Sequence, residues 1–223
     1  MSKPVIVVVG AGPGLGGATA HRFARDGYDV GLIARDPDRL ARLATDMEAD
    51  GIDVGYAAAD VANAESLHRA LTRMIEHTGR LDVLLHNPSV FRGVPALETT
   101  AEQLLADLAI GAASLLTSVQ AALPIWRAQR TGTLLVTGSG SADQPPPGGL
   151  TLGAQKSAIR ALVQGLAPEL AELGVHAATV TIYGFLKEGT PFAPARIADL
   201  YADLVAETAG DPASWRTVID LRA

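Results

Sequence analysis

Residues 5–16 read VIVVVGAGPGLG, and the expected fold follows from this stretch. Residues 5–9 are an unbroken run of β-branched side chains, which is typical of a strand buried on both faces. Gly10, Gly12, Gly14 and Gly16 follow directly, and a helical pattern begins near residue 14. Glycine lets the backbone turn sharply and approach a ligand, and the N-terminus of a helix stabilises negative charge. The stretch therefore predicts a strand, a tight turn and a helix that together hold a diphosphate.

The rest of the chain alternates strand and helix patterns without a break in composition. Further strands are predicted over residues 29–34, 54–59, 81–85, 133–137, 175–182 and 217–221. Helices are predicted over residues 14–25, 36–49, 63–78, 101–127, 151–173 and 194–208. Asp36 is expected to cap its helix, Pro124 to stop the fourth helix and Pro168 to distort the fifth. This order predicts an α/β fold, a Rossmann-type doubly wound parallel seven-stranded sheet flanked by helices in a single domain, residues 1–223.

Composition narrows the range of functions. The net charge is −6 and no long basic run occurs, so neither a nucleic acid nor an anionic membrane is expected as a partner. The chain has no cysteine, which excludes disulfides and thiol nucleophiles, and no set of His, Asp and Glu has the spacing of a metal site. The N-terminus enters a strand at once and lacks the pattern of a signal peptide. Because no apolar stretch looks long enough to span a membrane, a cytoplasmic protein is expected.

The spacing of Gly10, Gly14 and Gly16 resembles the turn of the short-chain dehydrogenase/reductase family, although Val9 stands where that family has threonine. Asp60-Val61, Asn87 and Tyr183-Gly184 resemble further motifs of the same family. The resemblance spans nearly the whole chain and implies a nicotinamide dinucleotide cofactor. The residues expected to bind it are Gly10, Gly12, Pro13, Gly14, Leu15, Gly16, Arg35, Asp60, Val61, Asn87, Pro88, Lys156, Tyr183 and Gly184.

Arg35 bears on the choice between the two nicotinamide cofactors. It is the first residue after the strand at 29–34, where an acidic residue would bind the ribose 2′-hydroxyl of NAD. A guanidinium can instead pair with the 2′-phosphate of NADP. Residue 34 is alanine, and Asp36 is explained as a helix cap, so NADP is the expected cofactor and NAD the alternative.

The resemblance also implies a catalytic set, of which this chain keeps two members. Ser139 matches the serine that orients the substrate carbonyl, and Lys156 matches the lysine that holds the nicotinamide ribose. Leu152 stands where the family has its proton-transferring tyrosine, and Gly111 where it has a supporting asparagine. Leucine can neither donate nor accept a proton, so the acid–base group is expected to be missing.

Two other side chains could supply a proton. Tyr183 follows the strand at 175–182, and His86 follows the strand at 81–85. Ordinary alternatives exist for both, since Tyr183 could be a packing residue in a loop and His86 a hydrogen-bonded loop histidine. A substrate that needs no proton from the enzyme, such as an activated C=C bond, would tolerate the loss.

These patterns predict an NADP(H)-dependent oxidoreductase that acts on a small carbonyl, alcohol or activated C=C substrate. The alternative is an inactive or non-redox dinucleotide-binding protein, such as a sensor, a partner subunit, a lyase or an isomerase. The short loop at 184–194 predicts an open substrate pocket lined by Phe185, Leu186, Phe192 and Leu152. Helices rich in Ala and Leu at 104–123 and 158–173 predict a homo-oligomer, a dimer or a tetramer, although the same composition fits an internal core.

Overall fold

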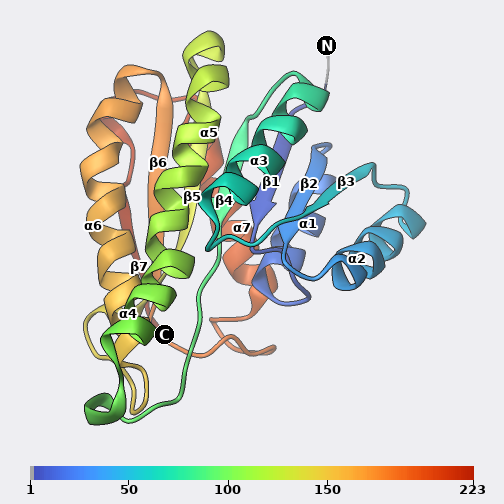
Figure 1. Ribbon diagram of the computed structural model, residues 1–223. Helices are drawn as coiled ribbons and strands as arrows, with labels where there is room; N and C mark the ends of the chain where they lie inside the picture. The colour runs from blue at the N-terminus through green and yellow to red at the C-terminus, as the bar shows by residue number, and fades with distance from the viewer. Residues whose placement is uncertain (1–2) are drawn as a thin grey trace.

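Residues 3–223, which the computed structural model describes, form a seven-stranded sheet in the order β3-β2-β1-β4-β5-β6-β7 (Figure 1). All neighbouring strands run parallel. The strands are β1 (Val5–Val9), β2 (Asp29–Ala34), β3 (Val54–Ala58), β4 (Val83–His86), β5 (Gly132–Ser139), β6 (Val175–Ile182) and β7 (Val218–Leu221). The chain moves outward from β1 to β3 and then returns to the other side of β1 at β4. The predicted doubly wound parallel sheet is confirmed, and the strand order reverses between β1 and β4.

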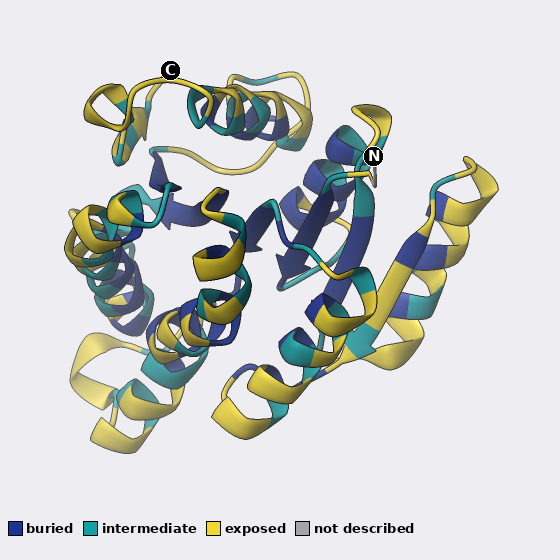
Figure 2. Ribbon diagram, turned by 90° about the horizontal axis from the view of Figure 1, so that it is seen from above, coloured by how far each residue is buried: buried dark blue, intermediate teal, exposed yellow. Residues whose placement is uncertain are grey.

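Helices cover both faces of the sheet. One face carries α1 (Leu15–Arg25), α2 (Pro37–Ala49) and α7 (Pro194–Glu207), and the other carries α3 (Ala64–Thr78), α5 (Ser114–Gln129) and α6 (Leu150–Glu172). Strand β1 supplies both cores, because Val5, Val7 and Val9 pack toward α3, α5 and α6 while Ile6 and Val8 pack toward α1, α2 and α7. Figure 2 shows the central strands buried and the exposed helix surfaces facing outward.

The predicted cap of α2 is confirmed. The Asp36 carboxylate accepts hydrogen bonds of 3.1 Å from the backbone N–H groups of Asp38 and Arg39, and Pro37 takes the first helical position. This cap fixes where β2 ends and where Arg35 leaves the sheet.

The helical region after β4 differs from the prediction. It runs as α4 (Ala101–Leu108), a π-helical segment η2 (Ala109–Ala113) and α5, and it continues past Pro124 to Gln129. Pro124 lacks a hydrogen-bond donor, but Trp126 beyond it is completely buried and donates to the Leu81 carbonyl at 3.2 Å. These tertiary contacts outweigh the local cost of proline. Pro168 likewise lies inside α6, which continues to Glu172.

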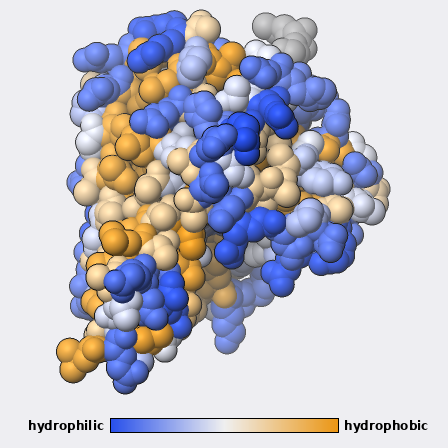
Figure 3. Space-filling model, in the orientation of Figure 1, coloured by the Kyte–Doolittle hydropathy of each residue, from blue (hydrophilic) through white to orange (hydrophobic). Residues whose placement is uncertain are grey.

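The same region corrects the expectation that no apolar stretch could span a membrane. Ala101–Gln129 is long and apolar enough by length and composition alone. Within this domain, however, it packs against α3 and α6, and its buried residues belong to the core between helices and sheet. Figure 3 shows apolar side chains gathered over α4, α5 and α6, and hydrophilic ones over α2 and α3. At least one side of this stretch is therefore apolar because it packs against other helices and the sheet of the same domain.

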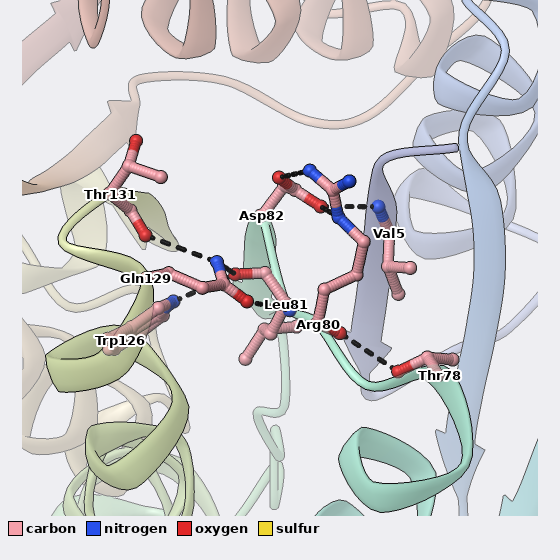
Figure 4. Close-up of polar contacts among 8 residues, drawn as sticks. All are labelled: Val5, Thr78, Arg80, Leu81, Asp82, Trp126, Gln129 and Thr131. Atoms are coloured by element: carbon pink, nitrogen blue, oxygen red, sulfur yellow. Dashed lines mark hydrogen bonds and ion pairs between the residues drawn. The ribbon is translucent and has the colours of Figure 1, made fainter. Parts of the chain in front are cut away.

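Strand β4 begins at Val83 rather than at Leu81 as predicted, and Figure 4 shows the reason. The Gln129 side chain accepts from the Leu81 N–H at 2.9 Å and donates to the Leu81 carbonyl at 3.0 Å. Leu81 thus bonds to a helix end instead of to a neighbouring strand. Asp82, next along, accepts from the Val5 N–H at 2.7 Å and from Arg80. This cluster secures the edge of the sheet opposite the loops that follow the strands.

Candidate active site

The glycine turn after β1 depends on close backbone packing. Gly10 has a φ of +83°, and a Cβ there would lie 2.9 Å from the Pro88 nitrogen. A Cβ at Gly16 would lie 2.9 Å from the Gly10 carbonyl oxygen, and one at Gly17 would lie 2.6 Å from the Gly12 oxygen. No sequence pattern indicates that position 17 must be glycine, because the requirement comes only from its contact with the Gly12 carbonyl. Helix α1 has no side-chain cap, and the Gly17 N–H donates to the Gly12 carbonyl at 2.7 Å, so the N–H groups of Leu15 and Gly16 are the ones left for an anion.

This turn borders a hollow of about 400 Å³ at the point where the strand order reverses. Its lining residues are Gly10, Ala11, Gly12, Pro13, Ala34, Arg35, Asp36, Arg39, Val61, Asn87, Pro88, Ser89, Val90 and Ile110. The structure therefore brings together half of the residues that the sequence indicated for cofactor binding, namely Gly10, Gly12, Pro13, Arg35, Val61, Asn87 and Pro88. Gly14, Leu15, Gly16, Asp60 and Lys156 do not line it, and Tyr183 and Gly184 line a different hollow. The group fits a dinucleotide, because a close-approaching backbone, an uncapped helix end and two arginines share one hollow.

Other predicted cofactor residues lie outside this lining. Leu15 packs in the core, and Gly14 leaves open space around its Cα. The Asp60 carboxylate accepts from the Ala62 N–H at 3.0 Å and shapes the turn before α3. Asn87, in contrast, does line the hollow, and its side chain donates to the Gly10 carbonyl at 3.0 Å, which links the loops that follow β1 and β4.

Arg39 joins Arg35 in this hollow, and sequence analysis missed it. Within residues 3–223, Arg35 makes no ion pair, whereas Arg39 lies 3.2 Å from an Asp36 carboxylate oxygen. The signal was present in the sequence, since Arg39 falls in the first turn of the helix that Asp36 caps. Arg35 and Arg39 share the hollow with one carboxylate, that of Asp36, so its lining carries more positive than negative charge.

A second hollow of about 800 Å³ lies beside the ends of β5 and β6. It holds Ser139, Leu152 and Tyr183 together. The remaining lining residues are Phe91, Gly140, Ser141, Asp143, Gln144, Pro146, Ile182, Gly184, Phe185, Leu186 and Arg222. Leu152 thus presents hydrocarbon to the same space as Ser139.

Phe192 corrects one expectation about this second hollow. It was predicted to line the pocket, but it packs beneath Gly184, where a Cβ would lie 2.2 Å from its ring. Phe192 therefore supports the loop that follows β6, while Phe185 and Leu186 provide the apolar lining.

Lys156 is buried under the site. Its ammonium donates to the Thr137 carbonyl at 2.8 Å, and burial lowers its pKa to about 8. A pKa of about 8 leaves the side chain mostly charged at neutral pH, with donors remaining for a ligand hydroxyl.

The proton of Tyr183 is engaged. Its hydroxyl donates to the Asp143 carboxylate at 2.6 Å, and Arg160 donates to the same carboxylate at 2.7 and 3.0 Å. The hydrogen bond to Asp143 raises the pKa of Tyr183, and Arg160 holds the pKa of Asp143 below its usual range. The Arg222 guanidinium lies 3.5 Å from the centre of the Tyr183 ring. Tyr183 therefore lines the second hollow but is a weak acid.

His86 is hydrogen-bonded, as one of its two interpretations expects, but it lies in a strand and not in a loop. It is the last residue of β4 and is 1% exposed, with its Nε2 3.3 Å from the Ser114 hydroxyl. Because that hydroxyl donates to the Ile110 carbonyl, Nε2 carries the proton shared with Ser114. Burial lowers the pKa of His86 to about 3, and the charge of Lys156 adds to the effect. A neutral, enclosed imidazole cannot deliver a proton to a substrate in the open hollow.

Comparison with known proteins agrees with this geometry. The family model described as short chain dehydrogenase matches residues 4–192. The chain belongs to the short-chain dehydrogenase family. An uncharacterized oxidoreductase of Listeria monocytogenes is 30% identical over 183 residues, which cover 82% of this chain and 74% of the relative. One of Staphylococcus haemolyticus is 29% identical over 176 residues, 79% of this chain and 75% of the relative.

Solved structures of short-chain dehydrogenases superpose over almost the whole molecule. A metagenomic short-chain oxidoreductase in complex with NADP has a TM-score of 0.86 at 25% identity, covering 99% of this chain and 97% of that one. An alcohol dehydrogenase from the archaeon Thermococcus sibiricus, complexed with 5-hydroxy-NADP, has a TM-score of 0.84 at 26% identity, covering 98% and 96%. The protein is therefore an oxidoreductase of short-chain type.

Within the short-chain dehydrogenase pattern, the motif-based assignment of four positions stays a prediction. Ser139 and Lys156 stand at the serine and lysine positions, and Leu152 and Gly111 at those of tyrosine and asparagine. The arrangement is consistent with this assignment, because Ser139 and Leu152 line one hollow and Lys156 lies one helical turn beyond Leu152. Among the described residues that line this hollow, the phenol is that of Tyr183, which directly follows β6.

Proposed function

We propose that the protein is an NADP(H)-dependent oxidoreductase that acts on a small carbonyl, alcohol or activated C=C substrate with an atypical active site. The observation that carries the proposal is that Arg35 and Arg39 share one hollow with the glycine turn. A 2′-phosphate at this edge would meet two guanidinium groups and no unpaired carboxylate. The descriptions of two similar solved structures name NADP or a derivative of it, which supports the same cofactor here.

Bound NADP(H) would supply or accept a hydride, and the protein would orient the reactants. Lys156 would hold the nicotinamide ribose through the ammonium donors that Thr137 does not use. Ser139 lies at the end of β5, and its hydroxyl donates to the Ser141 hydroxyl at 3.1 Å. It would exchange this bond for one to the substrate oxygen. Leu152 lines the same hollow and transfers no proton.

The proton for a carbonyl substrate comes from water in this proposal. Tyr183 is held by Asp143, and His86 is neutral and enclosed, so neither side chain is a good acid. The substrate hollow is wide, about 800 Å³, and solvent can enter it. A general acid typically contributes about 10²–10⁴-fold, so turnover of simple carbonyls should be slow and activated C=C bonds should react better.

Nucleotide titration tests the choice of cofactor. NADPH and NADH are titrated against the protein, and binding is followed by fluorescence. The double variant Arg35→Ala, Arg39→Ala should lower the affinity for NADPH by about 10–100-fold, because a charged hydrogen bond contributes about 1.5–3 kcal/mol. Its affinity for NADH should remain nearly unchanged. Arg42→Ala is the matched control, since Arg42 is exposed on α2 and lines no part of the hollow. Equal affinity for both nucleotides in the wild type would contradict the NADP assignment.

An activity screen tests the redox part. Carbonyl and enone substrates are mixed with NADPH, and the loss of absorbance is followed for wild type and for Leu152→Tyr. The substitution should raise carbonyl reduction, since a phenol would then enter the hollow that holds Ser139. Tight NADPH binding without oxidation across a broad panel would favour the alternative, a non-redox dinucleotide-binding protein.

A cytoplasmic location belongs to the same proposal. It rests on the packing of Ala101–Gln129 within the domain. Recovery of the tagged chain in the membrane fraction would contradict it.

A further inference from the structure

Gly111 lies in the π-helical segment η2, and its missing side chain is explained by space rather than by backbone conformation. Its φ is not positive. A Cβ at this position would lie 2.3 Å from Gln155 Oε1, 2.6 Å from its Cγ and 2.8 Å from its Cβ. Gln155 comes from α6, is completely buried and immediately precedes Lys156. The volume above Gly111 is therefore filled by a side chain from another helix.

The Gln155 amide bonds to backbone groups in two segments. Its Oε1 accepts from the Val90 N–H at 3.1 Å, and its Nε2 donates to the Val90 carbonyl at 3.0 Å. Nε2 also donates to the Thr151 carbonyl at 3.1 Å, within α6. Both polar groups of Val90 are thus paired with one side chain. A hydrocarbon of the same volume would fill the space without these bonds, so the amide does more than pack.

Val90 belongs to the loop after β4 that forms one wall of the hollow beside the glycine turn, called the nucleotide hollow from here on. This loop is fixed at its start by Asn87, which donates to Gly10, and at its end by Arg92, which donates to Asp107 at 3.0 Å. Gln155 holds the middle of the loop, between these two anchors, and connects it to the helix that carries Lys156.

We propose that Gln155 is a positioning residue that fixes the wall of the nucleotide hollow relative to Lys156, and that Gly111 is glycine in order to admit it. The proposal rests on the proposed nucleotide-binding function of this hollow. It accounts for the absence of an amide side chain at 111, because an amide from α6 already occupies that volume. Gln155 acts on the cofactor only through Val90 and Lys156.

An exchange of the two side chains tests the contact. Gln155→Ala should lower the melting temperature and weaken NADPH binding, because it leaves a hole and two unpaired groups on Val90. Gly111→Asn should also be harmful while Gln155 is present. The double variant Gln155→Ala, Gly111→Asn should recover much of the lost melting temperature and of the lost NADPH affinity. Its asparagine at position 111 can occupy the volume that Gln155 fills in the wild type. Losses that simply add in the double variant would overturn the proposal.

A second variant separates positioning from packing. Gln155→Met keeps the volume of the side chain but loses all three hydrogen bonds. The affinity for NADPH should fall by about tenfold, which is the effect of losing about one net hydrogen bond. The melting temperature should fall less than in Gln155→Ala. Gln164→Met on the exposed side of α6 is the matched control. Wild-type affinity in Gln155→Met would overturn the positioning role.

Failure of the proposed function would look different. If the wild type binds no nicotinamide nucleotide, the function falls, whereas the melting temperatures of the exchange still report whether Gln155 and Gly111 are coupled. A double variant that recovers stability but not nucleotide affinity would contradict positioning and leave only the packing contact.

Discussion

Leu152 and Tyr183 line the same hollow as Ser139, yet neither is suited to give up a proton. Leucine has none to give. The hydroxyl of Tyr183 donates to Asp143, whose charge is in turn stabilised by Arg160. Acid strength at this site therefore depends on which hydrogen bonds a side chain makes, and a tyrosine nearby does not by itself replace the missing one.

This difference gives a prediction for turnover on any substrate found by screening. Ser139→Ala should lower kcat/KM by about 10²-fold, because it removes a donor to the developing negative charge on the substrate oxygen. Tyr183→Phe should change kcat/KM by no more than about twofold, since its proton is held by Asp143. Steady-state kinetics of the two variants checks this. A large loss in Tyr183→Phe would identify Tyr183 as the acid.

His86 should make the fold sensitive to acid. Its pKa is about 3 in the folded chain and near 6.5 in the unfolded chain. Between these two pH values the unfolded chain binds a proton at His86 and the folded chain does not. The stability is therefore full above pH 6.5 and is lost as the pH falls toward 3. His86 alone should account for about 2 kcal/mol of the loss between pH 6.5 and about pH 5.

Urea unfolding at several pH values measures this effect. His86→Asn should flatten the dependence over that range, whatever its stability at neutral pH. His68→Asn, at an exposed position on α3, should keep the wild-type slope. An unchanged slope in His86→Asn would show that another group titrates.

At the scale of elements, the glycines of the β1–α1 turn divide into two kinds. A Cβ at Gly16 would press on the Gly10 carbonyl oxygen, whereas a Cβ at Gly12 would meet nothing within 4 Å. Gly12 also lines the nucleotide hollow. Gly16 is thus required by the packing of the protein itself, whereas Gly12 leaves space that a ligand can use.

Alanine substitution should separate these two roles. Gly16→Ala should destabilise the fold by about 1–3 kcal/mol through overpacking. Gly12→Ala should leave the free energy of unfolding nearly unchanged and weaken nucleotide binding instead. Chemical denaturation and NADPH titration of both variants check this. A Gly12→Ala variant that binds NADPH like the wild type would show that the diphosphate does not approach this residue.

For the whole molecule, we propose a homo-oligomer formed through the apolar surface over α4 and α5 in Figure 3. Leu105 and Leu116 on these helices are exposed, and Leu97 just before them is fully so. Exposed apolar residues gathered on one face of a folded domain favour association.

Light scattering after gel filtration measures the assembly. The wild type should have the mass of two or four chains, and Leu105→Glu with Leu116→Glu should shift it toward one chain. Tyr56→Glu is the control, because Tyr56 is exposed on the edge strand β3, away from this surface. A monomeric wild type would contradict the proposal.

The sequence by itself determined the layered architecture, because strand burial, helix periodicity and caps are local properties. The run Val5–Val9, the glycine turn and the Asp36 cap all lie where their patterns predicted. Half of the residues predicted to bind the cofactor do line one hollow, since parallel strands bring their carboxyl ends to one edge of the sheet.

Only the tertiary structure decided the chemistry of the individual side chains. The bond between Tyr183 and Asp143 joins residues 40 apart in sequence, and Gln155 fills the space over Gly111 from a different helix. Burial of His86, the turn of Phe192 beneath Gly184 and the continuation of α5 past Pro124 depend on similar contacts. A pKa, a cavity or a clash arises between segments that only folding brings together, so no local pattern encodes it.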